Sequence, residues 1–125
     1  KQAMVVTSKD GIDELSITDV THVHELRENQ ITIYDIDPRE YGLSTYPLKD
    51  IQVNTSEEAY LYGVEVLNGK RGAGFDMVAL NAGAALYTSD ITNTMAEGIE
   101  LAIKTIHSGK ALLLLNKFAK FTQQN

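Results

Sequence analysis

The sequence predicts an α/β fold with a β-rich first half and a helical second half. Extended runs rich in Val, Ile, Thr and Tyr dominate the part before residue 40. Capping patterns followed by apolar residues at helical spacing dominate the part after residue 54. A chain of 125 residues without an internal repeat or linker fits one domain, so residues 1–125 are treated as a single α/β unit.

The composition excludes several classes of protein. A net charge of -6 argues against a general nucleic-acid binder and against a polybasic membrane anchor. No apolar run approaches the roughly 18 residues that a membrane span needs. The absence of cysteine excludes disulfides, thiolate catalysis and Cys-ligated zinc, and is compatible with a reducing compartment. We therefore expect no nucleic-acid or membrane partner and a cytoplasmic protein.

The first predicted element is a strand that begins almost at the start of the chain. Residues 3–6, AMVV, are apolar throughout, which is typical of a buried strand such as those of parallel sheets. A buried strand needs neighbours on both sides, so we expect upstream residues to have been removed. An N-terminal strand exposed by processing is the alternative. A turn-rich loop at residues 7–11 follows, and residues 15–18, LSIT, predict a short strand.

Two further extended runs predict an antiparallel hairpin. Residues 21–27 and 31–36 are separated by a short polar stretch in which Asn29 tolerates a left-handed conformation. The next residues, 37–40, carry an Asp cap followed by Pro at the first helical position, which predicts a helical turn. Gly42 is expected to end this single turn.

The second half predicts four helices, near residues 55–67, 76–87, 94–109 and 111–121. Thr55 with Glu58, and Thr94 with Glu97, form capping boxes at the starts of the first and third helices. Asp76 is expected to cap the second helix, which is apolar on most sides and therefore buried. Its run of Ala and Gly allows close packing against a neighbouring element.

The adjacent carboxylates Asp13 and Glu14 are the candidate metal ligands. They follow a predicted strand and the Gly11 turn, and ligands of α/β sheets gather beyond the carboxyl ends of strands. Two carboxylates in a loop can converge on one hard cation, and Mg²⁺ prefers oxygen ligands and keeps waters or phosphates in its other positions. A solvated acidic turn is the competing interpretation.

Other polar residues favour structural roles. His22 and His24 share a strand face, but no third zinc ligand is evident. His107 suits a helix C-terminus. The loop at residues 70–74 could cradle a phosphate, yet it lacks the Gly-Lys-Ser/Thr ending of a P-loop, so a surface connection is the better interpretation. Asn81 interrupts an apolar helix and is expected to bond a neighbouring backbone rather than a substrate. No catalytic grouping or cofactor-binding residue can be argued from spacing.

Four ordered segments resemble the anthranilate phosphoribosyltransferase family. Residues 5–16, VVTSKDGIDELS, are similar to the family's VVHG-x-x-G-(L/M)-D-E-(L/I/V)-S segment. Residues 37–43, DPREYGL, resemble DPEDFGL, and residues 76–87, DMVALNAGAALY, resemble D-x-V-x-LNAAAALY. Residues 97–111 begin with EG and end with SGKA, as the family's fourth segment does. The similarity covers nearly the whole chain.

The resemblance implies a fold and a reaction. The fold is the large α/β domain of the nucleoside phosphorylase and phosphoribosyltransferase type, of which this chain would be the C-terminal part. The reaction transfers a phosphoribosyl group from phosphoribosyl pyrophosphate to anthranilate in tryptophan biosynthesis. Asp13 and Glu14 would bind the Mg²⁺ that helps to hold the pyrophosphate. No general acid or base is implied among these residues.

The chain departs from the family pattern in ways that set further expectations. The glycine-rich GTGGD loop, the KHGN segment and the N-terminal helical domain have no counterpart here. Thr7 replaces the histidine of VVHG, and residues 53–59, VNTSEEA, lack the glycines and asparagine of GG-x-x-x-ENA. We therefore expect an inactive segment when the chain is alone. The family dimerises through its helical domain, so any self-association would use another surface, and an exposed apolar patch is expected.

Two alternatives remain open from the sequence. One is a non-catalytic binding module that reuses the fold. The other is a different relative within the wider phosphoribosyltransferase and nucleoside phosphorylase group. The residues that contact the acceptor would decide, and the sequence does not contain them.

Overall fold

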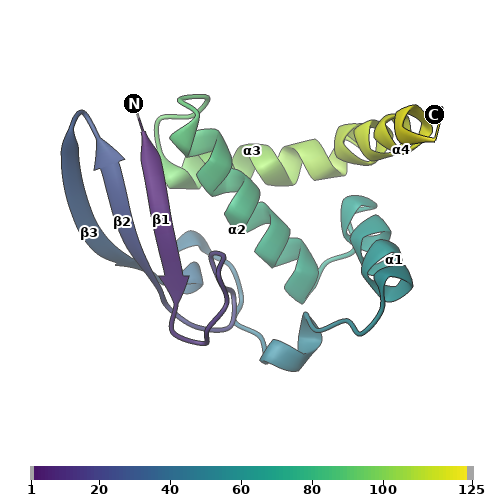
Figure 1. The fold of residues 1–125 in the computed structure, drawn as a ribbon, viewed down its shortest axis with the longest axis horizontal. Coiled ribbons are helices and arrows are strands. Elements are labelled where there is room, and N and C mark those ends of the chain that lie inside the picture. The colour runs from purple at the N-terminus through teal and green to yellow at the C-terminus, as the bar shows by residue number, and fades with distance from the viewer. Residues whose placement is uncertain (1, 124–125) are drawn as a thin grey trace.

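The computed structural model describes residues 2–123 and has a sheet followed by four helices (Figure 1). The strands come first, then two short 3-10 turns, then the helices that fill the second half of the chain. Their bounds are β1 Ala3–Ser8, β2 Thr21–Arg27, β3 Gln30–Ile36, η1 Pro38–Tyr41, η2 Leu48–Asp50, α1 Ser56–Leu67, α2 Ala73–Thr88, α3 Met95–His107 and α4 Lys110–Thr122. The predicted α/β class, with a β-rich first half and a helical second half, is confirmed.

The three strands form an antiparallel sheet in the order β1-β2-β3. The predicted hairpin is confirmed, and its loop has two residues, Glu28 and Asn29, at φ 51° and 64°. Both left-handed residues match the right-handed twist of the flanking strands. The register places Val5 opposite His24 and His24 opposite Ile33, so one strip of side chains crosses the outer face of the sheet.

Two predictions for the first half are wrong. The strand at residues 3–6 is neither buried nor parallel, because β1 pairs antiparallel with β2 and every second side chain, such as Val5, is exposed. Residues 15–18 form a buried loop rather than a strand. Their backbone groups are bonded by side chains, including those of Asn81 and Thr21, so they have no need of a ladder partner.

The helix ends follow the local sequence closely. Thr55 and Thr94 lie in extended conformation, and each hydroxyl accepts a hydrogen bond from the amide three residues on, at Glu58 and Glu97. The single turn η1 is capped by Asp37 and ends at a left-handed Gly, as predicted. The predicted start of α2 is wrong, since the helix begins at Ala73, before Asp76.

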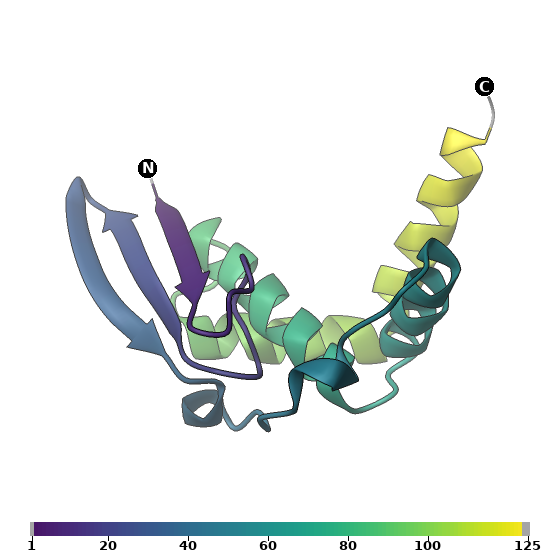
Figure 2. The same ribbon diagram turned by 60° about the horizontal axis from the view of Figure 1, so that its bottom comes forward.

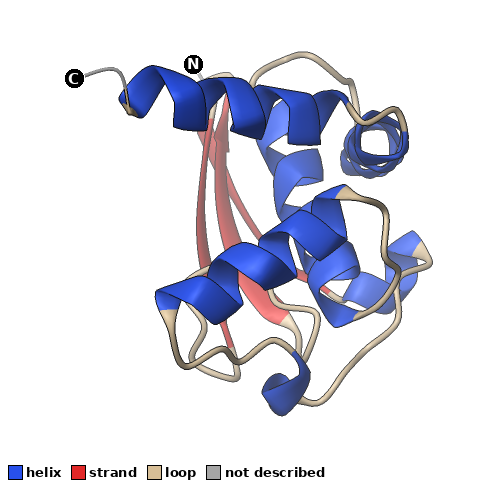
Figure 3. Cartoon of the chain, turned by 90° about the vertical axis from the view of Figure 1, so that its right-hand side faces the viewer, coloured by secondary structure: helices blue, strands red, loops and turns tan. Residues whose placement is uncertain are grey.

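The core lies between the inner face of the sheet and helices α2 and α3. Its fully buried side chains come from the loop after β1, from the sheet and from the helices, and include Leu15, Ile17, Val23 and Leu80. A second, smaller cluster joins α1, α2 and α3 through Val66, Phe75 and Ile106. Figure 3 shows the helices lying in front of the sheet. Helix α4 extends away from this body beside α1 (Figure 2). No helix among residues 2–123 is both long and apolar enough to cross a membrane.

Candidate metal site

Asp13 and Glu14 lie at the outer turn of the loop that joins β1 to β2. Both residues are exposed. Within residues 2–123, neither carboxylate has a hydrogen-bond or ion-pair partner. Two free carboxylates on adjacent residues suit a hard divalent cation, which would draw its remaining ligands from water or phosphate oxygens.

The surroundings of the pair set a limit on what the described part of the chain can bind. No group of three or more His, Asp or Glu side chains among residues 2–123 could hold a metal ion. A cation held by Asp13 and Glu14 would therefore have no third His, Asp or Glu ligand among these residues. This donor set fits Mg²⁺, which is commonly bound through one or two carboxylates together with substrate phosphates.

Glu14 also borders a groove beside the loop. The groove has a volume of about 660 Å³ and lies between the loop, η2, α1 and α2. Its lining is mainly apolar and includes Ile12, Leu48, Tyr62 and Met77. Glu14 and Gln52 are thus the polar side chains with a carboxylate or amide group in a mainly apolar groove.

The loop behind the pair is held by a cluster that the sequence did not reveal. The Asp10 carboxylate accepts hydrogen bonds from the Ile12 amide at 3.0 Å, from the Ser16 hydroxyl at 2.6 Å and from the Thr18 hydroxyl. Partial burial alone would raise the pKa of this carboxyl, but the Ser16, Thr18 and Ile12 donors outweigh it and lower the pKa to about 2. The only sequence signal was the turn-forming Asp-Gly at residues 10–11.

Asn81 reaches the same loop from α2. Its Oδ1 accepts from the Leu15 amide at 3.0 Å, and its Nδ2 donates to the Leu15 carbonyl at 2.8 Å and to the Met77 carbonyl at 3.0 Å. The prediction that Asn81 bonds neighbouring backbone is confirmed. Asp76, expected to cap α2, instead accepts from the Ser44 amide and the Tyr46 hydroxyl.

The histidines lie apart from the pair. His22 and His24 share the exposed face of β2, as predicted, and His22 Nδ1 is bonded to Asp35. His107 ends α3, and its Nε2 lies 3.1 Å from Arg71 Nη2.

The loop before α2 makes structural contacts. The Arg71 guanidinium lies 4.2 Å from the centre of the Phe75 ring, and Lys70 Nζ lies 2.7 Å from Glu65. The Gly74 amide donates to the Tyr62 hydroxyl at 2.8 Å, so it is not free to bind a phosphate. These contacts support the surface connection predicted from the sequence.

A second polar cluster lies on the inner face of the sheet, and the sequence did not predict it. Glu25 is buried and accepts hydrogen bonds from the Tyr34 hydroxyl at 2.8 Å and the Tyr87 hydroxyl at 2.7 Å. Arg27 donates to Tyr87 at 2.8 Å. Burial and the Glu25 carboxylate raise the pKa of Tyr87. The cluster ties the sheet to α2, and its exposed end is Arg27, whose Nη2 lies 4.0 Å from Asp90.

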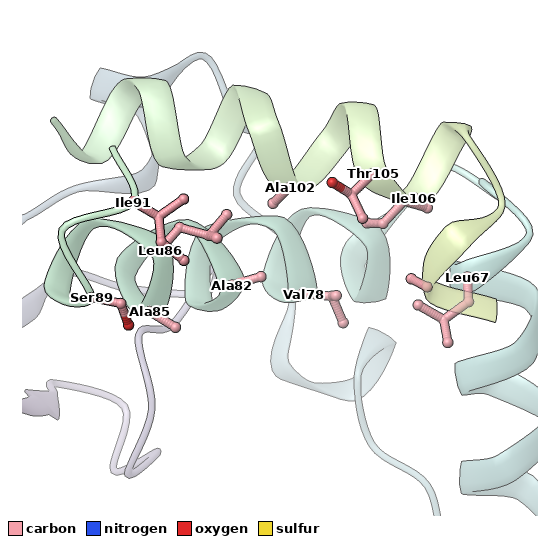
Figure 4. A pocket seen from close by; sticks show the side chains of 11 residues that line it. Leu67, Val78, Ala82, Ala85, Leu86, Ser89, Ile91, Ala102, Thr105 and Ile106 are labelled. Atoms are coloured by element: carbon pink, nitrogen blue, oxygen red, sulfur yellow. The ribbon is translucent and has the colours of Figure 1, made fainter. Parts of the chain in front are cut away.

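The groove between α2 and α3 is not a polar site. It has a volume of about 370 Å³, and Figure 4 shows its lining of mostly aliphatic side chains. Ser89 and Thr105 supply the hydroxyls. No charged side chain lines it, so it offers no group that could hold a phosphate or a metal.

The chain is similar to known sequences over nearly its whole length. Residues 1–112 match the model of the glycosyl transferase family, a/b domain. The anthranilate phosphoribosyltransferase of Xylella fastidiosa (strain M23) is 39% identical over 124 residues, which are 99% of this chain and 36% of that protein. The enzyme of Vesicomyosocius okutanii is 40% identical over 120 residues, which are 96% of this chain and 35% of that protein. The chain thus spans about a third of the length of the curated relatives it matches.

Solved structures show the same fold. Anthranilate phosphoribosyltransferase from Thermus thermophilus superposes with a TM-score of 0.88 at 32% identity, covering 98% of this chain and 36% of that one. The Saccharomyces cerevisiae enzyme in complex with PRPP and Mg gives a TM-score of 0.77 at 28% identity, covering 92% and 33%. Since the family model covers most of the chain, the protein belongs to the glycosyl transferase family and carries part of its α/β domain.

Proposed function

We propose that this chain is the C-terminal segment of an anthranilate phosphoribosyltransferase, the enzyme that transfers a phosphoribosyl group from phosphoribosyl pyrophosphate to anthranilate. The similarity to curated relatives of that name over 99% of the chain supports this proposal. The complex of the yeast relative with PRPP and Mg supports the substrate and the metal. Tryptophan biosynthesis and a cytoplasmic location follow from the same proposal.

Asp13 and Glu14 are the proposed ligands of Mg²⁺. The observation that carries this proposal is their placement as two free, exposed carboxylates on a loop that is anchored on both sides. A bound Mg²⁺ would offset the negative charge that develops on a departing pyrophosphate. The chain itself contributes two carboxylates, and no basic side chain among residues 2–123 forms an ion pair with either of them.

The chain by itself is proposed to lack turnover. No group of three or more His, Asp or Glu side chains could hold a metal among residues 2–123, and the sequence contains no GTGGD-type glycine-rich loop to enclose a pyrophosphate. The test is an assay of the purified chain with phosphoribosyl pyrophosphate, anthranilate and Mg²⁺, with a full-length relative as positive control. We expect no product above the protein-free reaction. Sustained turnover by the chain alone would overturn the proposed inactivity, and binding without turnover would fit a retained half-site.

We also propose that the chain self-associates through the outer face of its sheet. Val5, Ile31 and Ile33 are 65%, 69% and 66% exposed on that face. In this register Val5 and Ile33 lie on either side of His24, and Ile31 lies two residues before Ile33 on the same face of β3. An exposed apolar strip on a sheet favours association with a second copy of the same face.

A further inference from the structure

The Asp13–Glu14 pair lies in a loop that has no regular secondary structure to fix its shape. Residues 9–20 contain neither helix nor strand. At the base, the Ser8 amide donates to the Ile12 carbonyl at 3.2 Å and the Lys9 amide to the Val20 carbonyl at 3.0 Å. The bond to Val20 closes the loop at its base, and the bond to Ile12 holds the Ile12–Asp13 peptide from β1. Side chains hold the rest of the backbone around the pair.

On the C-terminal side of the pair, the anchor is the Asn81 side chain. It bonds both the amide and the carbonyl of Leu15, the residue directly after Glu14. The bond from the Leu15 amide, at 3.0 Å, fixes the plane of the Glu14–Leu15 peptide. A third bond, to the Met77 carbonyl, locks the amide orientation of Asn81 within α2. Helix α2 therefore fixes the backbone next to Glu14 and, through it, the direction of the Glu14 side chain.

On the N-terminal side, the anchor is the Asp10 side chain. It accepts from the amide of Ile12, the residue directly before Asp13. Its second oxygen accepts from the hydroxyls of Ser16 and Thr18, which lie beyond the pair. One carboxylate thus connects the two limbs of the loop across the position where Asp13 and Glu14 turn outward.

We infer that Asn81 and Asp10 are positioning residues for the Asp13–Glu14 pair, so that the two carboxylates reach a common cation. Asn81 fixes the Glu14–Leu15 peptide, and Asp10 fixes the Gly11–Ile12 peptide and ties it to Ser16 and Thr18. This inference rests on the proposed metal-binding role of the pair. Neither residue is proposed as a ligand, because the Asn81 amide bonds backbone groups and the Asp10 carboxylate accepts from donors within the loop. Partners that orient metal ligands in this way commonly change metal affinity by roughly ten- to a hundredfold when removed.

The first test asks whether Asn81 holds the loop in the metal-free chain. Asn81→Ala is compared with Asn68→Ala, a matched control whose amide donates to the Val64 carbonyl at 2.9 Å at the exposed end of α1. Hydrogen exchange of the Leu15 amide is measured by NMR. We expect exchange to be roughly tenfold faster in Asn81→Ala, since one hydrogen bond protects that amide, and unchanged in Asn68→Ala. Unchanged exchange in Asn81→Ala would overturn the inference.

The second test asks whether the anchors matter to the cation. Mn²⁺, a paramagnetic substitute for Mg²⁺, is titrated into wild type, Asn81→Ala, Asp10→Ala and Asn68→Ala while the relaxation of the Asp13 and Glu14 amide signals is followed. The affinity for Mn²⁺ is expected to fall about tenfold in Asn81→Ala and in Asp10→Ala, and to stay the same in Asn68→Ala. If Asn81→Ala does not fold, the Mn²⁺ titration of Asp10→Ala still tests the inference.

The outcomes separate this inference from the proposed metal site. Faster Leu15 exchange with unchanged Mn²⁺ affinity in a folded Asn81→Ala chain would overturn the positioning role while leaving the metal site intact. Wild type that binds no Mn²⁺ at millimolar concentration would overturn the metal site, and the Leu15 exchange result would then decide the anchoring alone.

Discussion

Asp10 combines three hydrogen-bond donors on one carboxylate, and this has a consequence for stability at low pH. Its pKa is lowered from 3.8 to about 2, so the folded state prefers the charged form more than the unfolded state does. The contribution of Asp10 is therefore complete above the unfolded pKa near 3.8 and is lost as the pH falls through about 2.

The measurement is a ¹³C NMR titration of the Asp10 carboxyl in the folded chain. We expect a midpoint near 2. In parallel, the difference in unfolding free energy between wild type and Asp10→Ala should shrink steadily between pH 3.8 and about 2. A midpoint at the ordinary value of 3.8, or a pH-independent difference, would contradict the account of the loop.

At the scale of single residues, the sequence predicted the pair Asp13–Glu14 but not the groups that hold it. The pair is visible because its residues are adjacent. Asp10, Ser16 and Thr18 could not be linked from the sequence, since their contacts depend on the path of a loop. For Asn81, the sequence predicted a bond to backbone, but it did not predict that the partner would be Leu15, 66 residues away.

At the scale of elements, α2 and α3 cross at two glycines. A Cβ added to Gly98 would lie 2.3 Å from the Gly83 carbonyl oxygen, which is backbone and cannot move aside without shifting a helix. The small-residue run of α2 predicted such close packing, and the crossing confirms it. The two helices depend on this contact because their buried residues, such as Ile99, pack directly beside it.

The matched variants are Gly98→Ala and Gly63→Ala. Gly63 also lies inside a helix, but a Cβ there meets no atom within 4 Å. We expect Gly98→Ala to lower the unfolding free energy by about 1–3 kcal/mol through overpacking, and Gly63→Ala to raise it by about 0.5–1 kcal/mol through helix propensity. Urea denaturation followed by circular dichroism gives both values. A Gly98→Ala chain as stable as wild type would show that the two helices have room for an added methyl group at their crossing.

Elements governed by local chemistry were predicted best. The hairpin, the Asp37 turn and the Thr55 and Thr94 caps depend on residues within four positions of one another. The buried parallel strand at residues 3–6 was wrong because a wholly apolar run hides which side chains face the core. The start of α2 was placed too late because Asp76 resembles a cap. Its carboxylate instead accepts a hydrogen bond from the Ser44 amide, which is distant in the sequence.

At the scale of the whole molecule, exposed apolar side chains lie on the outer face of the sheet, on α1 and on α4. On α4 they include Leu114, Phe118 and Phe121. The proposed contact between two copies uses the sheet face, since Val5, Ile31 and Ile33 all lie on it.

Sedimentation velocity over a range of concentrations tests this contact. Ile33→Lys should shift the chain toward monomer, because it places a charge among the exposed apolar side chains of this face. Ile91→Lys is the control, with a similarly exposed isoleucine in the α2–α3 connection. Equal effects of the two variants, or a wild type that is monomeric at every concentration, would contradict association through the sheet.

The central claim is that Asp13 and Glu14 retain the metal-binding half of a phosphoribosyltransferase site. The most direct measurement is Mn²⁺ relaxation enhancement across the amide spectrum of wild type and of the double variant Asp13→Asn, Glu14→Gln. We predict that the signals of residues 12–15 broaden first in wild type and that this broadening disappears in the double variant. Broadening centred elsewhere, such as on His22 and His24, or broadening that persists in the double variant, would contradict the claim.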